Sequence, residues 1–282
     1  MPNAKRARHK EARRQKVEQE RRQAKRQRLI RRIGVSIAVA VAVVGSILLI
    51  KGNLSTPLVS TTTVATSSTT TSTTTSVSTT SAPAAVSQIE ADALARQAGC
   101  PSSTSARANN LHWANAPAMT IKTSKKYYAD VVTTAGTFTI SLDAVNAPKT
   151  TNNFVYLANH EYFHCIIFHR AIPGFMVQTG DPTGTGSGGP GYSFADELPT
   201  GPYPLYSVAM ANAGPGTNGS QFFIVTGANG QSLADSYSRF GQVTTGQATI
   251  VKLDAAGNAD PASNGQPPLV THRIISVTIR TN

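Results

Sequence analysis

An uncharged run of 18 residues, IGVSIAVAVAVVGSILLI at positions 33–50, constrains this chain most, because a helix of that length is just long enough to cross a bilayer. A cleaved signal peptide is the alternative explanation. Its apolar part is usually shorter, however, and the following KGNLSTPLVS contains no A-x-A-like cleavage site. We therefore predict a single transmembrane helix that stays in the protein.

The net charge of the chain lies almost entirely before that run. Positions 1–32 contain 14 Lys or Arg and three Glu, whereas the other 250 residues contain 12 Lys or Arg and 11 Asp or Glu. Basic residues before a membrane span keep the N-terminus in the cytoplasm, so residues 51–282 are predicted to lie outside the cell membrane. The basic tail also suits contact with anionic lipid. Nucleic-acid binding by the tail is an alternative, but it would take place on the other side of the membrane from the rest of the chain.

Positions 51–85 are predicted to be a disordered linker. Within them, 21 of the 27 residues at positions 55–81 are Ser or Thr, and so polar a segment cannot bury enough apolar surface to offset the entropy of ordering. Its hydroxyl groups suit O-glycosylation, which the sequence alone does not establish. A short helix that ends at Gly99, followed by a connecting segment, is predicted for positions 86–118.

Residues 119–282 form the predicted globular domain. YYADVVTTAGTFTISLD has two β-rich runs around a short Ala-Gly turn, which indicates a hairpin. Further strands are predicted at CIIFHR, GFMVQTG, SVAMAN, QFFIVTG, RFGQVT and HRIISVTIR, and helices at APKTTNNFVYLANH and ATIVKLDAA. Many short strands separated by turn residues, with two helices, are typical of a mainly β antiparallel barrel.

HEYFH at positions 160–164 matches H-E-x-x-H, in which one helix carries two zinc-binding histidines and the glutamate activates water. Here the helical pattern stops before the motif, and the glycine and histidine of the extended protease pattern are missing. A chance cluster of His160, His164 and His169 near Cys165 is the remaining metal hypothesis. We predict that the chain holds no metal.

GSGGPG at positions 186–191 matches the G-x-G-x-x-G pattern of dinucleotide-binding folds. That pattern needs a strand before it and a helix after it, and Pro190 followed by YSFADELP provides no helix. The stretch is predicted to be a surface loop, and no cofactor is predicted.

Two longer stretches are far more specific. FHRAIPGFMVQTGD at positions 168–181 matches the F-H-R-x-I-P-x-F-M-x-Q-x-G-D signature of cyclophilins, and MANAGPGTNGSQFF at positions 210–223 matches their M-A-N-A-G-P-x-T-N-G-S-Q-F-F motif. RFGQV at positions 239–243 is similar to the family's late F-G-x-V strand. From about Tyr127 to Arg280 the chain therefore resembles a cyclophilin-type peptidyl-prolyl cis-trans isomerase, in a bacterial, membrane-anchored form.

The resemblance implies a closed eight-stranded antiparallel barrel with two capping α-helices and an active groove on its outer face. It implies that Arg170 is the catalytic arginine and that Gln178 holds its guanidinium. The implied substrate-binding residues are a proline pocket of Phe175, Met176 and Phe223, an edge of Ala211 and Asn212 for the substrate backbone, and Gln221, Leu233 and Tyr237 beside them.

These residue types also suit the reaction on chemical grounds. Rotation about a peptide bond faces a barrier of about 18–20 kcal/mol, because resonance gives the C–N bond partial double-bond character. In the twisted state the proline nitrogen can accept a hydrogen bond, which the always-charged fork of an arginine can donate. An interaction that is stronger in the twisted state than in either planar state accelerates both directions. Taken singly, each residue also fits a structural role in the barrel core or in a turn.

The rim of the implied groove departs from the cyclosporin-sensitive members of the family. Their tryptophan falls at Gln231 or Ser232 here, and Tyr237 falls where many members have histidine and many bacterial members have tyrosine. Because the tryptophan lies at the rim, the resemblance predicts isomerase activity without it but weak binding of cyclosporin.

The predicted function is rotation of X-Pro bonds in exported or surface proteins, which assists their folding. The predicted partners are proline-containing polypeptides and the membrane, without nucleic acid, and the protein is predicted to be a monomer. A non-catalytic module that binds proline-containing segments is the alternative function, although such a module would not need Arg170.

Cys100 and Cys165 are the only cysteines in the sequence. A disulfide between them can persist if residues 51–282 lie outside the membrane, and it would pin the segment before the barrel. Two unrelated thiols are the alternative, because the sequence does not establish that the two Cα atoms approach within about 7 Å. A free thiol is a liability in an exported chain, so we predict the bond.

Overall fold

Alternating burial along the first hairpin sets one face of an antiparallel sheet against the core. In the computed structural model, which describes residues 87–282, strand β1 (Tyr127–Thr133) buries every second residue, among them Ala129 and Val131. Strand β2 (Gly136–Leu142) does the same with Phe138 and Ile140. The two strands pair in register around a tight turn that ends at Gly136, whose φ of 133° suits glycine. The predicted hairpin is confirmed.

Three predicted segments lie outside the described residues. They are the basic tail at positions 1–32, the transmembrane helix at positions 33–50 and the linker at positions 51–85. These three remain predictions. Among the helices of residues 87–282, none combines the length and the apolar character needed to cross a membrane.

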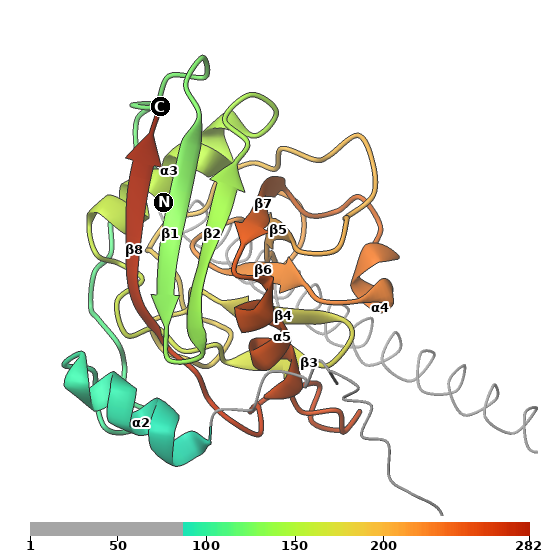
Figure 1. Cartoon of the computed structure of the whole chain (residues 1–282). Coiled ribbons are helices and arrows are strands. Elements are labelled where there is room, and N and C mark those ends of the chain that lie inside the picture. The colour runs from blue at the N-terminus through green and yellow to red at the C-terminus, as the bar shows by residue number, and fades with distance from the viewer. Residues whose placement is uncertain (1–86) are drawn as a thin grey trace, which may run out of the picture. The chain divides into compact units, whose positions relative to one another are not determined.

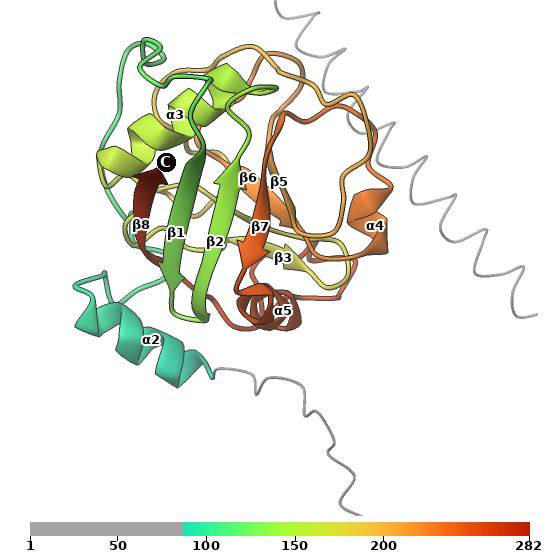
Figure 2. The same cartoon turned by 45° about the horizontal axis from the view of Figure 1, so that its top comes forward.

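The other elements mostly follow the predicted positions. They are α2 (Gln88–Gln97), α3 (Pro148–Asn159), β3 (Arg170–Ile172), β4 (Met176–Thr179), β5 (Ser207–Met210), β6 (Phe222–Val225), α4 (Ala228–Gln231), β7 (Arg239–Thr245), α5 (Gln247–Ala255) and β8 (Ile274–Thr281). The one-turn helix α4 was not predicted. Figures 1 and 2 show α3 and α5 near opposite ends of the curled sheet, as expected of the two capping helices.

The expected closed barrel needs a correction. The strand order is β3-β4-β6-β5-β7-β2-β1-β8, with antiparallel neighbours, and no ladder joins β3 to β8 in residues 87–282. The two edges of the sheet meet only around an isolated bridge between Ile167 and Arg273, where a few backbone hydrogen bonds join residues 165–168 to residues 272–274. The structure is therefore a curled, mainly β antiparallel sheet rather than a continuous eight-stranded ring.

The strand predicted at CIIFHR is also wrong for most of its length. Cys165 has a φ of 64°, outside the extended region, and regular pairing begins only at Arg170. The apolar residues of this stretch are buried nonetheless, with Ile166 and Phe168 at most 2% exposed. Burial without a regular ladder explains why their β-rich composition misled the prediction.

Four phenylalanines from distant parts of the chain meet in the core. Phe154 of α3 lies 5.0 Å from Phe163, 5.5 Å from Phe222 of β6 and 5.4 Å from Phe240 of β7, measured between ring centroids. All four are at most 2% exposed. Each such burial contributes about 1.5–3 kcal/mol relative to an exposed side chain, so this cluster fixes α3 against the sheet.

The segment before the sheet is tied to it by covalent and polar contacts. The structure joins Cys100 to Cys165 by a disulfide bond, with the Cα atoms 5.3 Å apart. The buried guanidinium of Arg273 donates to the carbonyls of Cys165, Pro101 and Ser103 at 2.9–3.1 Å. Further along, Trp113 packs its ring 5.3 Å from that of Tyr156. Residues 87–126 thus lie against the sheet rather than apart from it.

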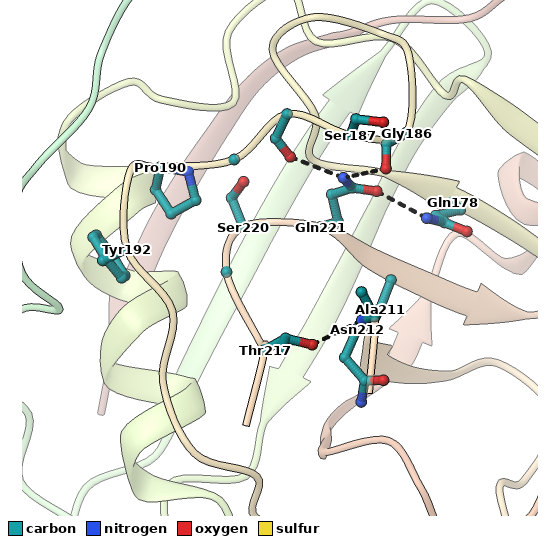
Figure 3. A pocket seen from close by; sticks show the side chains of 14 residues that line it. Gln178, Gly186, Ser187, Pro190, Tyr192, Ala211, Asn212, Thr217, Ser220 and Gln221 are labelled. Carbon is teal, nitrogen blue, oxygen red and sulfur yellow. Dashed lines mark hydrogen bonds between the residues drawn. The ribbon is translucent and has the colours of Figure 1, made fainter. Parts of the chain in front are cut away.

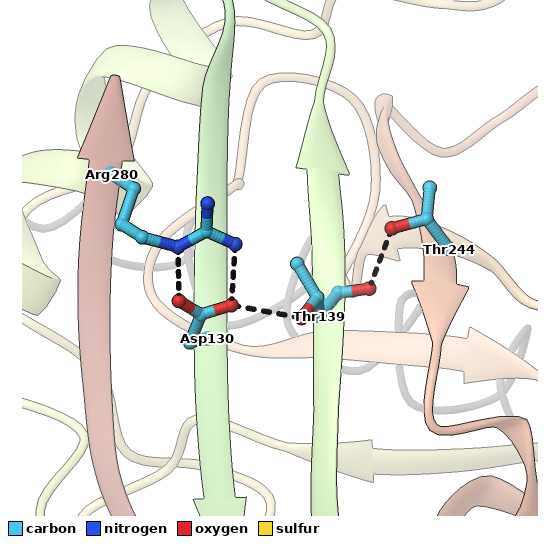
Figure 4. A network of polar contacts seen from close by, with 4 residues as sticks. All are labelled: Asp130, Thr139, Thr244 and Arg280. Carbon is cyan, nitrogen blue, oxygen red and sulfur yellow. Dashed lines mark hydrogen bonds and ion pairs between the residues drawn. The ribbon is translucent and has the colours of Figure 1, made fainter. Parts of the chain in front are cut away.

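A polar row crosses the outer face of strands β8, β1, β2 and β7 (Figure 4). Arg280 forms a two-pronged ion pair with Asp130, and Thr139 donates to the same carboxylate at 2.8 Å. Thr244 then donates to the Thr139 carbonyl at 3.3 Å. The hydrogen bonds from Arg280 lower the pKa of Asp130. Such cross-strand pairs favour one register of the sheet.

Candidate active site

A second apolar cluster lies on the outer face of the sheet, separate from the core. Side chains alternate between the two faces of a strand, so β4 sends Val177 into the core and Met176 to the other face. Strand β6 likewise sends Ile224 inward and Phe223 outward. Met176 and Phe223 are only 3% and 4% exposed, because loop residues cover them. An apolar site on the outside of the sheet therefore follows from strand periodicity.

This cluster lines a cavity of about 170 Å³. Nine of the ten predicted catalytic and substrate-binding residues line it: Arg170, Phe175, Met176, Gln178, Ala211, Asn212, Phe223, Leu233 and Tyr237. The tenth, Gln221, is hydrogen-bonded to Gln178 at the edge of the cavity. The structure thus brings together residues that are up to 67 positions apart, from Arg170 to Tyr237. Their roles remain predictions.

Sheet register sets the distance between the charged end and the apolar end of the cavity. Arg170 at the start of β3 lies opposite Gln178 of β4, and Gln178 lies opposite Phe223 of β6. One row across three strands therefore runs from a guanidinium through an amide to an aromatic ring. Burial lowers the pKa of Arg170, but a guanidinium stays protonated in proteins.

A chain of side-chain amides orients the guanidinium. Gln221 donates its NH₂ group to the carbonyls of Gly186 and Gly188, at 3.0 and 2.9 Å. Its oxygen therefore faces Gln178, whose NH₂ donates to it at 2.9 Å. The oxygen of Gln178 is left to accept from Nη1 of Arg170, at 3.3 Å. The loop carbonyls thus set the orientation of the Gln221 amide, which in turn sets that of Gln178. The Gln178 oxygen is then the acceptor for the arginine.

The glycine-rich loop at positions 186–191 is the anchor of that chain. Figure 3 shows Gln221 between the loop and Gln178, beside a hollow that adjoins the cavity and shares Gln178, Ala211 and Asn212 with it. The carboxylate of Asp181 accepts from the backbone N–H of Gly188 at 3.0 Å. A side chain at Gly188 would place its Cβ 2.0 Å from Asp181 Oδ1, so glycine is required there. The predicted surface loop thus has a structural role at the site.

Hydrogen bonds from the protein, rather than water, stabilise the ionised form of buried Asp181. Burial opposes ionisation, but donors from Thr183 and the Gly188 N–H outweigh it and lower the pKa of Asp181. Two of those donors, Thr183 N and Thr183 Oγ1, lie 2.7 Å from Oδ1. The loop that supports Gln221 is therefore built around a buried negative charge.

Aromatic contacts close the apolar end of the cavity. The ring of Tyr237 stands edge-on to Phe223, with centroids 5.4 Å apart and planes at 90°. The hydroxyl of buried Tyr203 donates to the Tyr237 carbonyl at 2.9 Å and accepts from its N–H at 3.0 Å. Tyr203 was not among the predicted site residues, although it fixes the backbone of one that was.

The edge at Ala211 and Asn212 leaves the sheet in a defined conformation. The N–H of Ala211 donates to the Gln221 carbonyl at 2.9 Å, and the side chain of Asn212 donates to the Ser236 carbonyl at 2.9 Å. Asn212 Oδ1 also accepts from the N–H of Gly214 at 3.2 Å. This segment is thus held at the mouth of the cavity by side-chain and backbone bonds.

Comparisons with known proteins agree with this geometry. The family model for the cyclophilin type peptidyl-prolyl cis-trans isomerase/CLD matches residues 128–279, more than half of the chain. This chain belongs to that family. Peptidyl-prolyl cis-trans isomerase-like 1 of Aspergillus fumigatus is 48% identical over 131 residues, which are 44% of this chain and 81% of that protein. Peptidyl-prolyl cis-trans isomerase B of Streptomyces anulatus is 39% identical over 175 residues, 56% of this chain and 99% of that protein.

Solved cyclophilin structures share the fold. The crystal structure of a cyclophilin type isomerase from Cryptosporidium parvum aligns with a TM-score of 0.51 at 33% identity, covering 56% of this chain and 99% of that one. A second crystal structure of that protein, in the presence of the dipeptide Ala-Pro, has a TM-score of 0.50 at 33% identity. It covers 55% of this chain and 99% of that one. The cyclophilin-like fold and the isomerase activity predicted from the sequence are confirmed.

The HEYFH histidines of this cyclophilin do not share a helix. Helix α3 ends at Asn159, so neither histidine lies on it as a zinc protease would require. Nδ1 of His160 lies 2.7 Å from the Tyr156 carbonyl, and Nδ1 of His164 lies 2.6 Å from the Ile275 carbonyl. The two aromatic residues between them are at most 1% exposed.

Side-chain ligand atoms of Cys100, His164 and Cys165 lie within 4.8 Å of one another. A zinc site would need the cysteines as thiolates, and here their sulfurs are bonded to each other. His169 lies elsewhere and is 2% exposed, with neither ring nitrogen hydrogen-bonded. Burial lowers the pKa of His169 to about 4, so the ring is neutral. The alternative hypothesis of a metal cluster at His160, His164 and His169 therefore finds no matching donor set in this group.

One contact of Arg170 was missed by the sequence analysis. Arg170 donates to both the backbone and the side chain of Asn264, which lies 94 positions later in the chain. The Asn264-Gly265 pair is a common turn dipeptide, and this signal alone predicts a loop without saying what the loop contacts.

Proposed function

We propose that this cyclophilin rotates X-Pro bonds at the outer-face cavity, with Arg170 as the catalytic residue. The observation that carries the proposal is a guanidinium at the edge of a small cavity with apolar walls, where no carboxylate of residues 87–282 pairs with it. Within residues 87–282 the side-chain acceptors of Arg170 are the neutral amides of Gln178 and Asn264. Its positive charge is therefore not neutralised before substrate binds.

The cavity suits a proline ring and the peptide bond before it. Phe175, Met176 and Phe223 supply apolar walls that grip the ring and remove water from the imide. For X-Pro, the cis and trans forms differ by only about 0.5–1 kcal/mol, so a catalyst mainly needs to stabilise the twisted state. As the bond twists, the proline nitrogen becomes a hydrogen-bond acceptor, and the donors of Arg170 face it across the cavity. Donors fixed in a water-poor site stabilise such a developing charge more than water does.

The neighbouring edge would hold the substrate backbone. Ala211 and Asn212 lie at the mouth of the same cavity, with their own conformation fixed by bonds to Gln221 and Ser236. With the proline ring in the cavity and the neighbouring backbone at this edge, the C–N bond would be held close to Arg170 while it rotates. The crystal structure of the Cryptosporidium parvum relative in the presence of Ala-Pro supports a proline-containing peptide as the ligand class.

Binding to a short X-Pro peptide tests the placement of the substrate. In NMR titrations, we expect shift changes at Met176, Ala211 and Asn212, and Phe223→Ala should weaken the peptide Kd by about tenfold, or about 1.4 kcal/mol. Val145→Ala, which changes a residue that is 71% exposed and does not line the cavity, is the control. Unchanged affinity in the Phe223 variant would place the substrate elsewhere.

We also propose that the domain acts on exported or surface proteins while tethered to the cell membrane. The uncharged run at positions 33–50 and the preceding net charge of +11 at positions 1–32 support a single span with a cytoplasmic N-terminus. A disulfide between Cys100 and Cys165 supports an oxidising compartment for the isomerase domain.

Fractionation and reporter fusions test this topology. The full chain should remain in membranes after a high-salt wash, and a reporter that is active only outside the membrane should work when fused after residue 85. A fusion after residue 30 should be inactive. Full release by salt, or activity of the residue 30 fusion alone, would overturn the proposed topology.

A further inference from the structure

The guanidinium of Arg170 is held on the side away from Gln178 as well. Its Nε donates to the Asn264 backbone carbonyl at 2.9 Å, and its Nη2 donates to Asn264 Oδ1 at 2.7 Å. Both distances are shorter than the 3.3 Å from Nη1 to Gln178 Oε1. One residue thus binds two of the three nitrogens of the fork.

Asn264 is itself placed by a loop that packs on strand β3. Its φ of 52° lies in the left-handed region, which asparagine tolerates better than most residues. The N–H of Ala171, the residue after Arg170, donates to the Gly265 carbonyl at 2.9 Å. A Cβ at Gly265 would lie 2.4 Å from Ile172 Cγ1, so this close approach requires glycine. The loop that carries Asn264 is therefore in direct contact with the strand that carries the arginine.

We propose that Asn264 is a positioning residue for the isomerase reaction, which aims the guanidinium of Arg170 at the reacting bond. The proposal rests on the catalytic role proposed for Arg170. A guanidinium has five N–H donors, and Asn264 with Gln178 occupies three of them. One N–H on Nη1 and one on Nη2 remain for the substrate.

The neutrality of Asn264 matters as much as its geometry. An aspartate or glutamate at this distance would fix the fork equally well, but it would offset the charge that the twisted peptide bond needs. An asparagine oxygen and a backbone carbonyl restrict rotation about the arginine side chain without adding a negative charge. Because a fork that is already aligned loses less entropy in the transition state, the effect should fall on kcat and leave KM unchanged.

The test uses the purified full chain with Asn264→Gly. Glycine accepts the left-handed backbone and keeps the carbonyl that binds Nε, so only the Oδ1 contact is removed. Loss of one such hydrogen bond predicts a fall in kcat of about fivefold, with KM within a factor of two. Ser263→Ala is the matched control, because Ser263 Oγ bonds Asp260 and Gly265 in the same loop but does not touch Arg170.

Arg170→Lys provides the second half of a double-mutant cycle. Lysine keeps the charge but has no fork for Asn264 to align, so Asn264→Gly should have no further effect on kcat in that background. Asn264→Ser, whose hydroxyl is too short to reach Nη2, repeats the test if the glycine variant does not fold.

The possible results separate this inference from the proposed function. A lower kcat in Asn264→Gly, absent in Ser263→Ala and absent with Arg170→Lys, supports the inference. Full kcat in Asn264→Gly while Arg170→Lys is impaired overturns the inference and leaves the proposed function intact. Equal losses in Asn264→Gly and Ser263→Ala assign the effect to loop stability and also overturn it. Full activity of Arg170→Lys refutes the proposed catalytic role of the fork and the inference with it.

Discussion

Replacing both Cys100 and Cys165 by alanine should lower the free energy of unfolding by about 4 kcal/mol. The disulfide joins residues 65 positions apart in sequence. Closing a loop of that length removes conformational entropy from the unfolded chain, which amounts to about 4 kcal/mol at 25 °C in the chain-entropy description. The two cysteines are 7% and 2% exposed, so loss of the buried sulfurs adds to the effect in the alanine variant.

Urea unfolding of residues 86–282 measures this difference. Reduced wild-type protein is the matched control, because it keeps the sulfur atoms and loses only the covalent link. It should lose nearly as much stability as the alanine variant. Isomerase activity at 25 °C should persist in both, since the ladder from Arg170 through Gln178 to Phe223 does not include either cysteine.

Two results would refute this reasoning about the disulfide. One is a loss of less than about 1 kcal/mol on reduction, which would mean that the link does not restrict the unfolded chain as the loop length predicts. The other is the titration of two free thiols per chain in unfolded, unreduced protein, which would mean that the bond does not form.

Three further predictions concern the buried histidines, the rim of the groove and the absence of a metal site at the bonded cysteines. Burial lowers the pKa of His169 and His272 to about 4 in the folded protein, against about 6.5 in the unfolded chain. The free energy of unfolding that these neutral rings contribute is therefore fully present above pH 6.5 and is lost towards pH 4, by about 1.4 kcal/mol per pH unit for each histidine. Equal urea midpoints at pH 7 and pH 5 would contradict this. Cyclosporin should inhibit weakly, and Trp in place of exposed Gln231 or Ser232 should strengthen inhibition by adding apolar contact; tight inhibition of the wild type would contradict it. Chelators should change neither activity nor melting temperature, and stoichiometric zinc that is lost together with activity in His164→Ala would revive the metal hypothesis.

Much of the candidate site could be predicted because short sequence motifs carry it. The stretch from Arg170 to Gln178 spans two paired strands, so the spacing within one motif already sets the arginine beside its amide. The alternation in QFFIV likewise predicts that Phe223 and its neighbour Phe222 face opposite sides of the sheet, as the two separate apolar clusters show. The sequence analysis took these site residues from the resemblance to cyclophilins, and strand pairing and alternation give the physical reason for their placement.

The remaining features depend on contacts between distant segments. Asn264 contacts Arg170 although the two are 94 positions apart in the sequence. A turn dipeptide does not indicate which strand the turn packs on. The closed barrel was expected from the resemblance to cyclophilins, whereas the edges meet only around the bridge of Ile167 with Arg273. Cys165 at a φ of 64° could not be foreseen either, because CIIFHR has the composition of a strand.

The most direct test of the proposed mechanism is the kcat/KM of residues 86–282 on a peptide with one X-Pro bond, for the wild type and Arg170→Ala. In a protease-coupled assay the wild type should accelerate isomerisation. Arg170→Ala should lose at least about tenfold in kcat/KM, or about 1.4 kcal/mol of transition-state stabilisation, at an unchanged melting temperature. An Arg170→Ala protein that folds normally and keeps full activity would contradict the assigned role of the guanidinium.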